Sequence, residues 1–214
     1  MMRRADTPAG EVVLRRRGDV DELVVNGVFA MDSAEVASER ALADAAGSPP
    51  GRVLVGGLGL GYTAARLLDA GAAQLRVVEL AGPLVTWARE GHTEQLGRLA
   101  HDARVELVTG DIAEHVDGVW DAILLDVDNG PSFLIHDHNQ RVYAEDFLRT
   151  CLKALVPGGR LVVWCEAESP ALASTLERIA GRVELIKVPV TRQGRRFDYA
   201  LYRAHAEGGT RVRE

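Results

Sequence analysis

The sequence is poor in lysine and aromatic residues, and it has no long apolar run. Only Lys153 and Lys187 stand among 25 basic residues, and 31 acidic residues give a formal net charge of −6. Because nucleic-acid binding needs a basic face that neutralises phosphates, this balance argues against nucleic acid as the main partner. No apolar stretch approaches the roughly 20 residues that span a bilayer, which argues against a membrane partner.

Cysteine is also scarce. Cys151 and Cys165 have no spacing typical of a metal or redox site, so we expect buried thiols in a reducing compartment. The N-terminus "MMRRADTPAG" lacks the apolar core of a secretion signal, and together these features predict a cytoplasmic protein. A chain of 214 residues with 47% hydrophobic content fits one large domain with a small appendage.

The chain divides into a short β-rich beginning and a longer segment of alternating strands and helices. Short β-type runs and the turn signal Asn26-Gly27 predict a small β-hairpin or meander over residues 11–31. A helix capped by Asp32 is expected over residues 32–47. Apolar strands are then expected at 52–56, 74–80, 104–109, 121–126, 160–165, 182–190 and 197–203, and helices at 62–70, 83–99, 111–116, 139–155 and 170–180.

This alternation predicts an α/β, Rossmann-like fold. We expect a seven-stranded sheet that is parallel except for an antiparallel C-terminal hairpin, with helices on both faces. Residues 1–47 would form the N-terminal hairpin and helix, residues 48–205 the ligand-binding domain, and residues 206–214 a loose tail. The aromatic residues Tyr143 and Phe147 and the three tryptophans are expected in the core.

The stretch "GGLGLG" after the first strand of this sheet indicates either a ligand site or, taken alone, only a tight turn. Gly57, Gly59 and Gly61 let the backbone approach a ligand closely, at the edge where such folds bind nucleotides. Glu79 ends the second strand, where an acid accepts hydrogen bonds from both ribose hydroxyls; the alternative is a solvated glutamate. Asp111 follows the third strand and would meet an adenine amino group or cap a helix.

Five stretches together resemble the class I S-adenosylmethionine-dependent transferases, and most of all their spermidine synthase branch. They are "VLVGGLGLGYT", "VVEL", "ARVELVTGD", "WDAILLDVDNGP" and "LKALVPGGRLVVWCEAESP". The resemblance covers residues 50–175 well. It implies a bound sulfonium nucleoside, S-adenosylmethionine or its decarboxylated form. The implied contacts to it are Gly57, Gly59, Leu60, Gly61, Glu79, Leu80, Gly110, Asp111, Ile112 and Asp126.

The fourth strand departs from the pattern of that branch, which is Asp-x-x-Asp-Pro. Asp126 matches the first acid, which accepts the proton of the attacking amine, whereas Asn129 replaces the acid that anchors the diamine, and Asp128 is additional. The resemblance thus implies that Asp126 is catalytic, and Asp128 is the neighbouring acid that would otherwise take this role. Acceptor contacts are expected at Asn129, His136 and Glu166. The branch's Tyr-His-Glu trio is reduced to one acid, in "ASE" at residues 37–39.

The loop after that strand also contains His136 and His138. Two histidines without a third ligand do not predict a metal site, and the alternatives are a proton acceptor or a solvated loop.

Leu60 stands where the branch has an aspartate that holds the ammonium of the aminopropyl chain. An aspartate would repel the carboxylate of intact S-adenosylmethionine, whereas leucine would not, so we predict that intact donor is preferred. The leading hypothesis is methyl transfer to a small-molecule amine or other nucleophile. The alternatives are aminopropyl transfer from the decarboxylated donor and a non-catalytic nucleoside-binding protein. The resemblance also implies a homodimer formed through the N-terminal hairpin.

Overall fold

The N-terminal residues form a small antiparallel sheet. The computed structural model describes residues 2–8, 10–127, 130–131, 137–192 and 194–206. The predicted meander is confirmed, but it has four strands in sequence order and begins earlier, at an edge strand. Asn26 and Gly27 both have positive φ, as the tight hairpin turn requires. The strands are β1 (Met2–Thr7), β2 (Gly10–Arg17), β3 (Val20–Val25) and β4 (Val28–Asp32).

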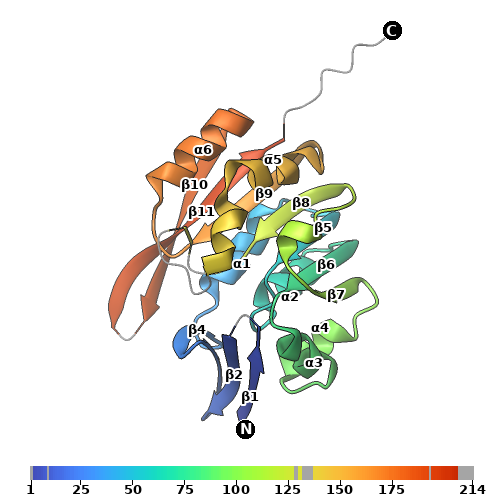
Figure 1. Ribbon diagram of the computed structural model, residues 1–214, viewed down its shortest axis with the longest axis vertical. Helices are drawn as coiled ribbons and strands as arrows, with labels where there is room; N and C mark the ends of the chain where they lie inside the picture. The colour runs from blue at the N-terminus through green and yellow to red at the C-terminus, as the bar shows by residue number, and fades with distance from the viewer. Residues whose placement is uncertain (1, 9, 128–129, 132–136, 193, 207–214) are drawn as a thin grey trace.

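The larger sheet has seven strands in the order β10-β11-β9-β8-β5-β6-β7 (Figure 1). The five strands β9, β8, β5, β6 and β7 pair in parallel, whereas β11 pairs antiparallel with both β9 and β10. The predicted fold class is therefore confirmed. The strands are β5 (Arg52–Gly56), β6 (Gln74–Glu79), β7 (Val105–Thr109), β8 (Trp120–Leu125), β9 (Leu155–Cys165), β10 (Val183–Arg192) and β11 (Arg195–His205).

Apolar side chains of this sheet are buried on both of its faces. In β5, Val53 and Val55 belong to one hydrophobic cluster and Leu54 to the other, since successive side chains of a strand alternate. Helices α1 (Ala37–Ala45), α2 (Tyr62–Asp69), α3 (Gly82–Arg89) and α4 (Glu94–Ala100) pack on the first cluster. Helices α5 (Glu145–Lys153) and α6 (Pro170–Ala180) pack on the second. The short 3₁₀ segments are η1 (Ile112–Glu114) and η2 (Asp137–Tyr143).

Several helix boundaries differ from the prediction. Asp32 does not cap α1; its carboxylate accepts from the amides of Ala34 and Glu35 in a turn before the helix. The helix expected at 83–99 is two helices, because Gly91 takes positive φ and Thr93 caps α4. The expected helix 111–116 is only the turn η1, and 139–155 is divided between η2 and α5.

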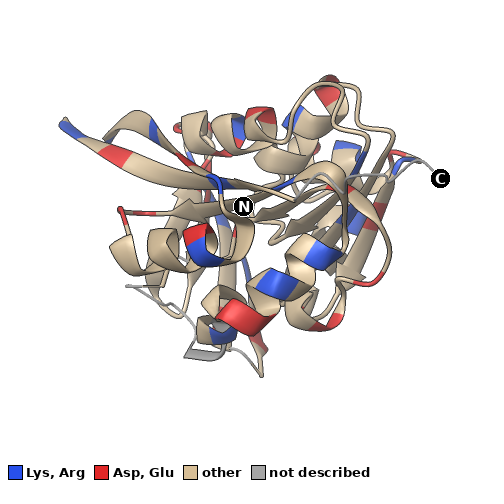
Figure 2. Cartoon of the chain, turned by 90° about the horizontal axis from the view of Figure 1, so that it is seen from above, with Lys and Arg blue, Asp and Glu red and all other residues tan. Residues whose placement is uncertain are grey.

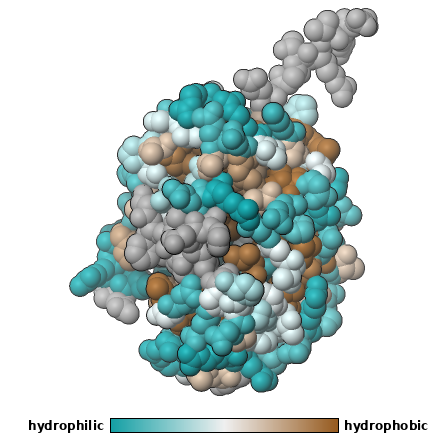
Figure 3. Space-filling model, in the orientation of Figure 1, coloured by the Kyte–Doolittle hydropathy of each residue, from teal (hydrophilic) through white to brown (hydrophobic). Residues whose placement is uncertain are grey.

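The outer surface is mainly hydrophilic. Basic and acidic residues lie interspersed when the molecule is seen from above (Figure 2). Apolar side chains show in small patches between hydrophilic ones on the face of Figure 3. Trp87, Trp120, Cys151 and Cys165 are buried, as predicted. None of the helices in the described part of the chain is long and apolar enough to cross a membrane.

Candidate functional site

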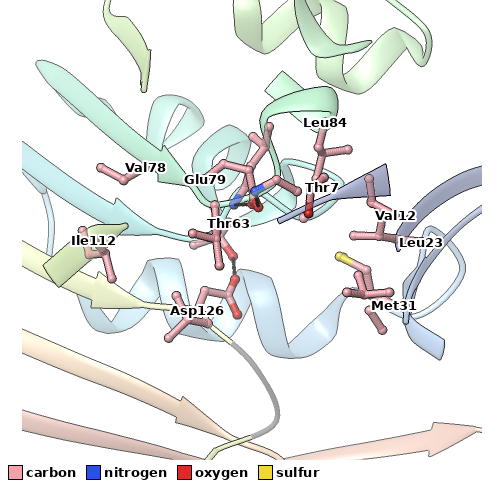
Figure 4. A pocket seen from close by; sticks show the side chains of 18 of the residues that line it. Thr7, Val12, Leu23, Met31, Thr63, Val78, Glu79, Leu84, Ile112 and Asp126 are labelled. Carbon is pink, nitrogen blue, oxygen red and sulfur yellow. Dashed lines mark hydrogen bonds between the residues drawn. The ribbon is translucent and has the colours of Figure 1, made fainter. Parts of the chain in front are cut away.

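A cavity lies at the carboxyl ends of β5, β6 and β8, where the strand order reverses. Strand β5 pairs with β6 on one side and with β8 on the other, and such a switch point is the usual ligand site of open α/β sheets. The N-terminal sheet closes the opposite side of this cavity (Figure 4). The site is therefore built from two parts of the chain that are distant in sequence.

The glycine loop is shaped by close approaches of backbone. Gly57 has a φ of 94°, and a Cβ at this position would lie 2.1 Å from the carbonyl oxygen of Asp126, so only glycine fits. Gly59 also has positive φ and faces the sulfur of Met31 from β4. That sulfur accepts the amide N–H of Leu60 at 3.2 Å. The loop is thus held between β8 and the N-terminal sheet.

Glu79 at the end of β6 binds the backbone of this loop. One carboxylate oxygen accepts from the amide of Leu58 at 2.8 Å, and the other accepts from the amide of Ala81 at 2.8 Å. Each carboxylate oxygen can accept more than one hydrogen bond. These amide bonds orient the carboxylate in the cavity wall.

Asp111 combines both of the roles weighed from the sequence. It caps η1, since one of its carboxylate oxygens accepts from the amide of Ala113 at 2.8 Å, and it also lines the cavity. Its other oxygen pairs with the guanidinium of Arg141 from η2. Its neighbours Gly110 and Ile112 line the same part of the cavity.

Asp126 follows β8 and has an unusual environment. Burial, together with the nearby carboxylates of Glu39 and Glu79, raises the pKa of its carboxyl to about 7. The hydroxyl of Thr63, which donates to Asp126 at 2.7 Å, opposes this shift. Asp126 therefore changes its protonation state near neutral pH.

Glu39 of α1 is the second acid in this part of the cavity. Burial raises the pKa of its carboxyl, while a hydrogen bond from the hydroxyl of Ser38, at 2.7 Å, and the charge of Arg192 lower it. Two carboxyls that repel each other in a partly dry cavity favour a cation between them. The sequence retains the acid Glu39, but nothing in the sequence indicated that α1 packs beside α2 and so brings Glu39 to the cavity.

All charged side chains among the described residues that line the cavity are acidic. They are Glu11, Glu39, Glu79, Asp111 and Asp126. The rest of the lining is largely apolar, and it includes Trp164, which we had expected in the core. The cavity is therefore suited to a ligand with positive charge and apolar surface.

The structure brings eight of the ten predicted donor contacts to the cavity; Leu60 and Gly61 do not line it, and neither does Glu166, which was predicted to contact the acceptor. Gly57, Gly59, Glu79, Leu80, Gly110, Asp111, Ile112 and Asp126 line the cavity. Leu60 does not: its side chain is 2% exposed and belongs to the hydrophobic core. Gly61 lies at the start of α2 against Leu96 and Leu99, and Glu166 is exposed outside the cavity.

The explanation given above for Leu60 is therefore wrong. Its side chain points into the core, so it does not meet the tail of a ligand. Asp128, Asn129 and His136 lie outside the described residues, as does the side chain of His138. Sequence reasoning did not identify Thr63 or the N-terminal sheet as parts of the cavity, because only tertiary packing brings them there.

Taken together, the doubly wound sheet, its glycine loop and the acids at three strand ends form a Rossmann-like fold with a candidate ligand site at its switch point. A family model described as "Methyltransferase small domain" matches residues 22–190. The chain belongs to this methyltransferase family.

Solved structures of spermidine synthases share the architecture. The enzyme from Thermotoga maritima aligns with a TM-score of 0.76 at 17% identity over 96% of this chain and 72% of its own. A spermidine synthase in complex with the transition-state analogue AdoDATO gives 0.77 at 18%, over 96% and 73%. A probable spermidine synthase from Corynebacterium glutamicum gives 0.70 at 18%, over 94% and 79%. At this identity the likeness shows the fold. No curated protein sequence matches the chain significantly.

Proposed function

We propose that this chain is a transferase that moves a group from a sulfonium nucleoside of the S-adenosylmethionine type to an amine. The observation that carries the proposal is the acidic cavity at the switch point of the sheet, with Asp126 and Glu39 side by side in its wall. Family membership and the spermidine synthase architecture support the donor class.

The described residues fit such a donor. Glu79 would accept from the ribose hydroxyls, and Asp111 would accept from the adenine amino group. Gly57 and Gly59 both line the cavity, so the nucleoside would lie against the loop backbone. When bound, the donor supplies an electrophilic carbon next to a positive sulfur, which leaves as a neutral thioether.

Asp126 would handle the proton of the acceptor. A carbon–nitrogen bond forms as the carbon–sulfur bond breaks, the bonding electron pair stays on sulfur, and the proton released by nitrogen passes to the Asp126 carboxylate. A pKa of about 7 suits this role, because the base is then ionised at mildly alkaline pH and still accepts a proton readily. Thr63 orients the carboxylate through its hydrogen bond.

The charge of the cavity favours the decarboxylated donor and hence aminopropyl transfer. No Lys or Arg side chain among the described lining residues faces the carboxylate of intact S-adenosylmethionine, and residues 128–136 add neither type by sequence. The earlier preference for intact donor depended on Leu60, which lies in the core. Methyl transfer is the second candidate, and the family match favours it.

The thioether product distinguishes the two reactions. We would incubate the protein with each donor and a mixture of amines, and identify the nucleoside product by mass spectrometry. 5′-Methylthioadenosine reports aminopropyl transfer, and S-adenosylhomocysteine reports methyl transfer. Asp126→Asn should abolish product, whereas Glu166→Gln, an exposed acid outside the cavity, should not. Neither product from any amine, or unchanged product from Asp126→Asn, would contradict the proposal.

A further inference from the structure

The five acids of the cavity differ in what already neutralises them. Glu11 pairs with Arg4, Asp111 pairs with Arg141, and both oxygens of Glu79 accept backbone amides. Asp126 accepts from the hydroxyl of Thr63, and Glu39 accepts from the hydroxyl of Ser38 and from its own backbone amide. Among the described residues neither acid has a cationic side chain within salt-bridge distance, although the charge of Arg192 lies near enough to lower the pKa of Glu39. The described cavity thus offers one place for an ammonium group.

The wall that faces this place is mainly apolar; the same sheet also adds Thr7 and Glu11 to the lining, and Glu11 is paired with Arg4. We call the apolar part the N-terminal wall; it comprises Val12, Leu23, Val25, Ala30 and Met31. Figure 4 shows the side chains of Val12, Leu23 and Met31 across the cavity from Asp126. The donor would occupy the glycine loop and the ends of β6 and β7, so this wall is left for the acceptor.

An apolar wall discriminates against a second charge. An ammonium group placed there would lose its hydration without gaining an unpaired carboxylate among the described residues, which is costly, whereas an alkyl or aryl group would gain by burial. Spermidine synthase-like architecture alone does not imply this discrimination against a second ammonium group, because the discrimination depends on the side chains of this chain's own N-terminal sheet.

We propose that the acceptor is a monoamine with an apolar body, its nitrogen held between Glu39 and Asp126 and its body against the N-terminal wall. The inference rests on the proposed transfer to an amine and specifies its substrate class. The chemical step is the one given above, with the released proton on Asp126.

The test compares two amines of equal length, n-hexylamine and 1,6-diaminohexane. Calorimetry measures their binding to protein saturated with 5′-methylthioadenosine or S-adenosylhomocysteine, whichever binds, and turnover is measured with the matching donor. We expect hexylamine to bind about tenfold more tightly, because the second ammonium would be desolvated without a partner. Equal binding, tighter binding of the diamine, or no binding of either amine would overturn the inference.

Two variants distinguish an effect of the N-terminal wall on amine preference from a general effect of added negative charge. Val25 lines the cavity, whereas its neighbour Val24 is equally half-buried on the same strand but does not line it. Val25→Asp should shift the preference about fivefold toward the diamine, because it supplies a carboxylate for the second ammonium, and Val24→Asp should not shift it. The same shift in both variants would contradict the role of the wall. Failure of both nucleosides to bind would instead refute the proposed function itself.

Discussion

Replacing Asp126 by asparagine should make the stability of the protein less sensitive to pH. Burial raises the pKa of Asp126 from 3.8 to about 7, so between these values the folded protein holds a proton that the unfolded chain has released. The carboxyl therefore stabilises the fold fully below about pH 4, and this contribution is lost as pH rises through 7. Asparagine does not titrate, so the variant does not lose stability in this way as pH rises.

The shift sets the size of the effect. Of the range from pH 5 to pH 8, the wild type loses stability from this source only up to the folded pKa of about 7, that is over roughly two pH units. At about 1.4 kcal/mol per unit, the loss is about 2–3 kcal/mol. Asp126 is half-buried, and solvent access reduces this ceiling, so we expect Asp126→Asn to gain about 2 kcal/mol relative to wild type from pH 5 to pH 8.

Urea unfolding at pH 5 and pH 8 measures this gain directly. The matched control is Asp146→Asn, which removes an exposed aspartate of α5 and should show no comparable gain. A difference between Asp126→Asn and wild type that stays constant with pH, within about 0.5 kcal/mol, would refute the environment assigned to Asp126.

Three other substitutions test separate parts of the site. Glu79→Gln should weaken nucleoside binding about tenfold or more in calorimetry, since it removes a charged acceptor yet retains one oxygen for a loop amide; unchanged affinity would exclude the ribose role. Leu60→Asp should lower the free energy of unfolding by about 4 kcal/mol, because it places a carboxylate in the core. A stable Leu60→Asp with altered donor preference would restore the sequence-based explanation. Gly57→Ala should lower the free energy of unfolding in urea by about 2 kcal/mol or more, because Cβ would clash with the Asp126 carbonyl. A change near zero would mean that the loop backbone does not approach this carbonyl as described.

The fold was predictable from sequence wherever burial imposed a pattern. Strands such as β5 and β8 are buried on both faces, so each reads as a short apolar run between polar or glycine-rich segments. Strand β1, "MRRADT", is an edge strand that is mostly exposed, and it has no such pattern. The break between α3 and α4 was also missed, because the amphipathic pattern continues through Gly91.

The candidate site was predictable where it lies at strand ends. Glu79 ends a strand of the parallel sheet, Asp111 and Asp126 each follow one, and the topology alone brings the three acids to one edge. Glu39 reaches the cavity only because α1 packs beside α2. The orientation of Leu60 depends on how the loop turns into the core, and a linear motif does not determine it.

The most direct test of the central claim is a calorimetric titration of the wild-type protein with S-adenosylmethionine and with its decarboxylated form, at one ionic strength. An acidic cavity built around Glu79, Asp111 and Asp126 should bind both sulfonium nucleosides, and the decarboxylated form, which lacks the carboxylate, should bind more tightly. Tighter binding of intact donor would contradict the assignment of aminopropyl transfer. Binding of neither nucleoside would contradict the claim that this cavity is a donor site.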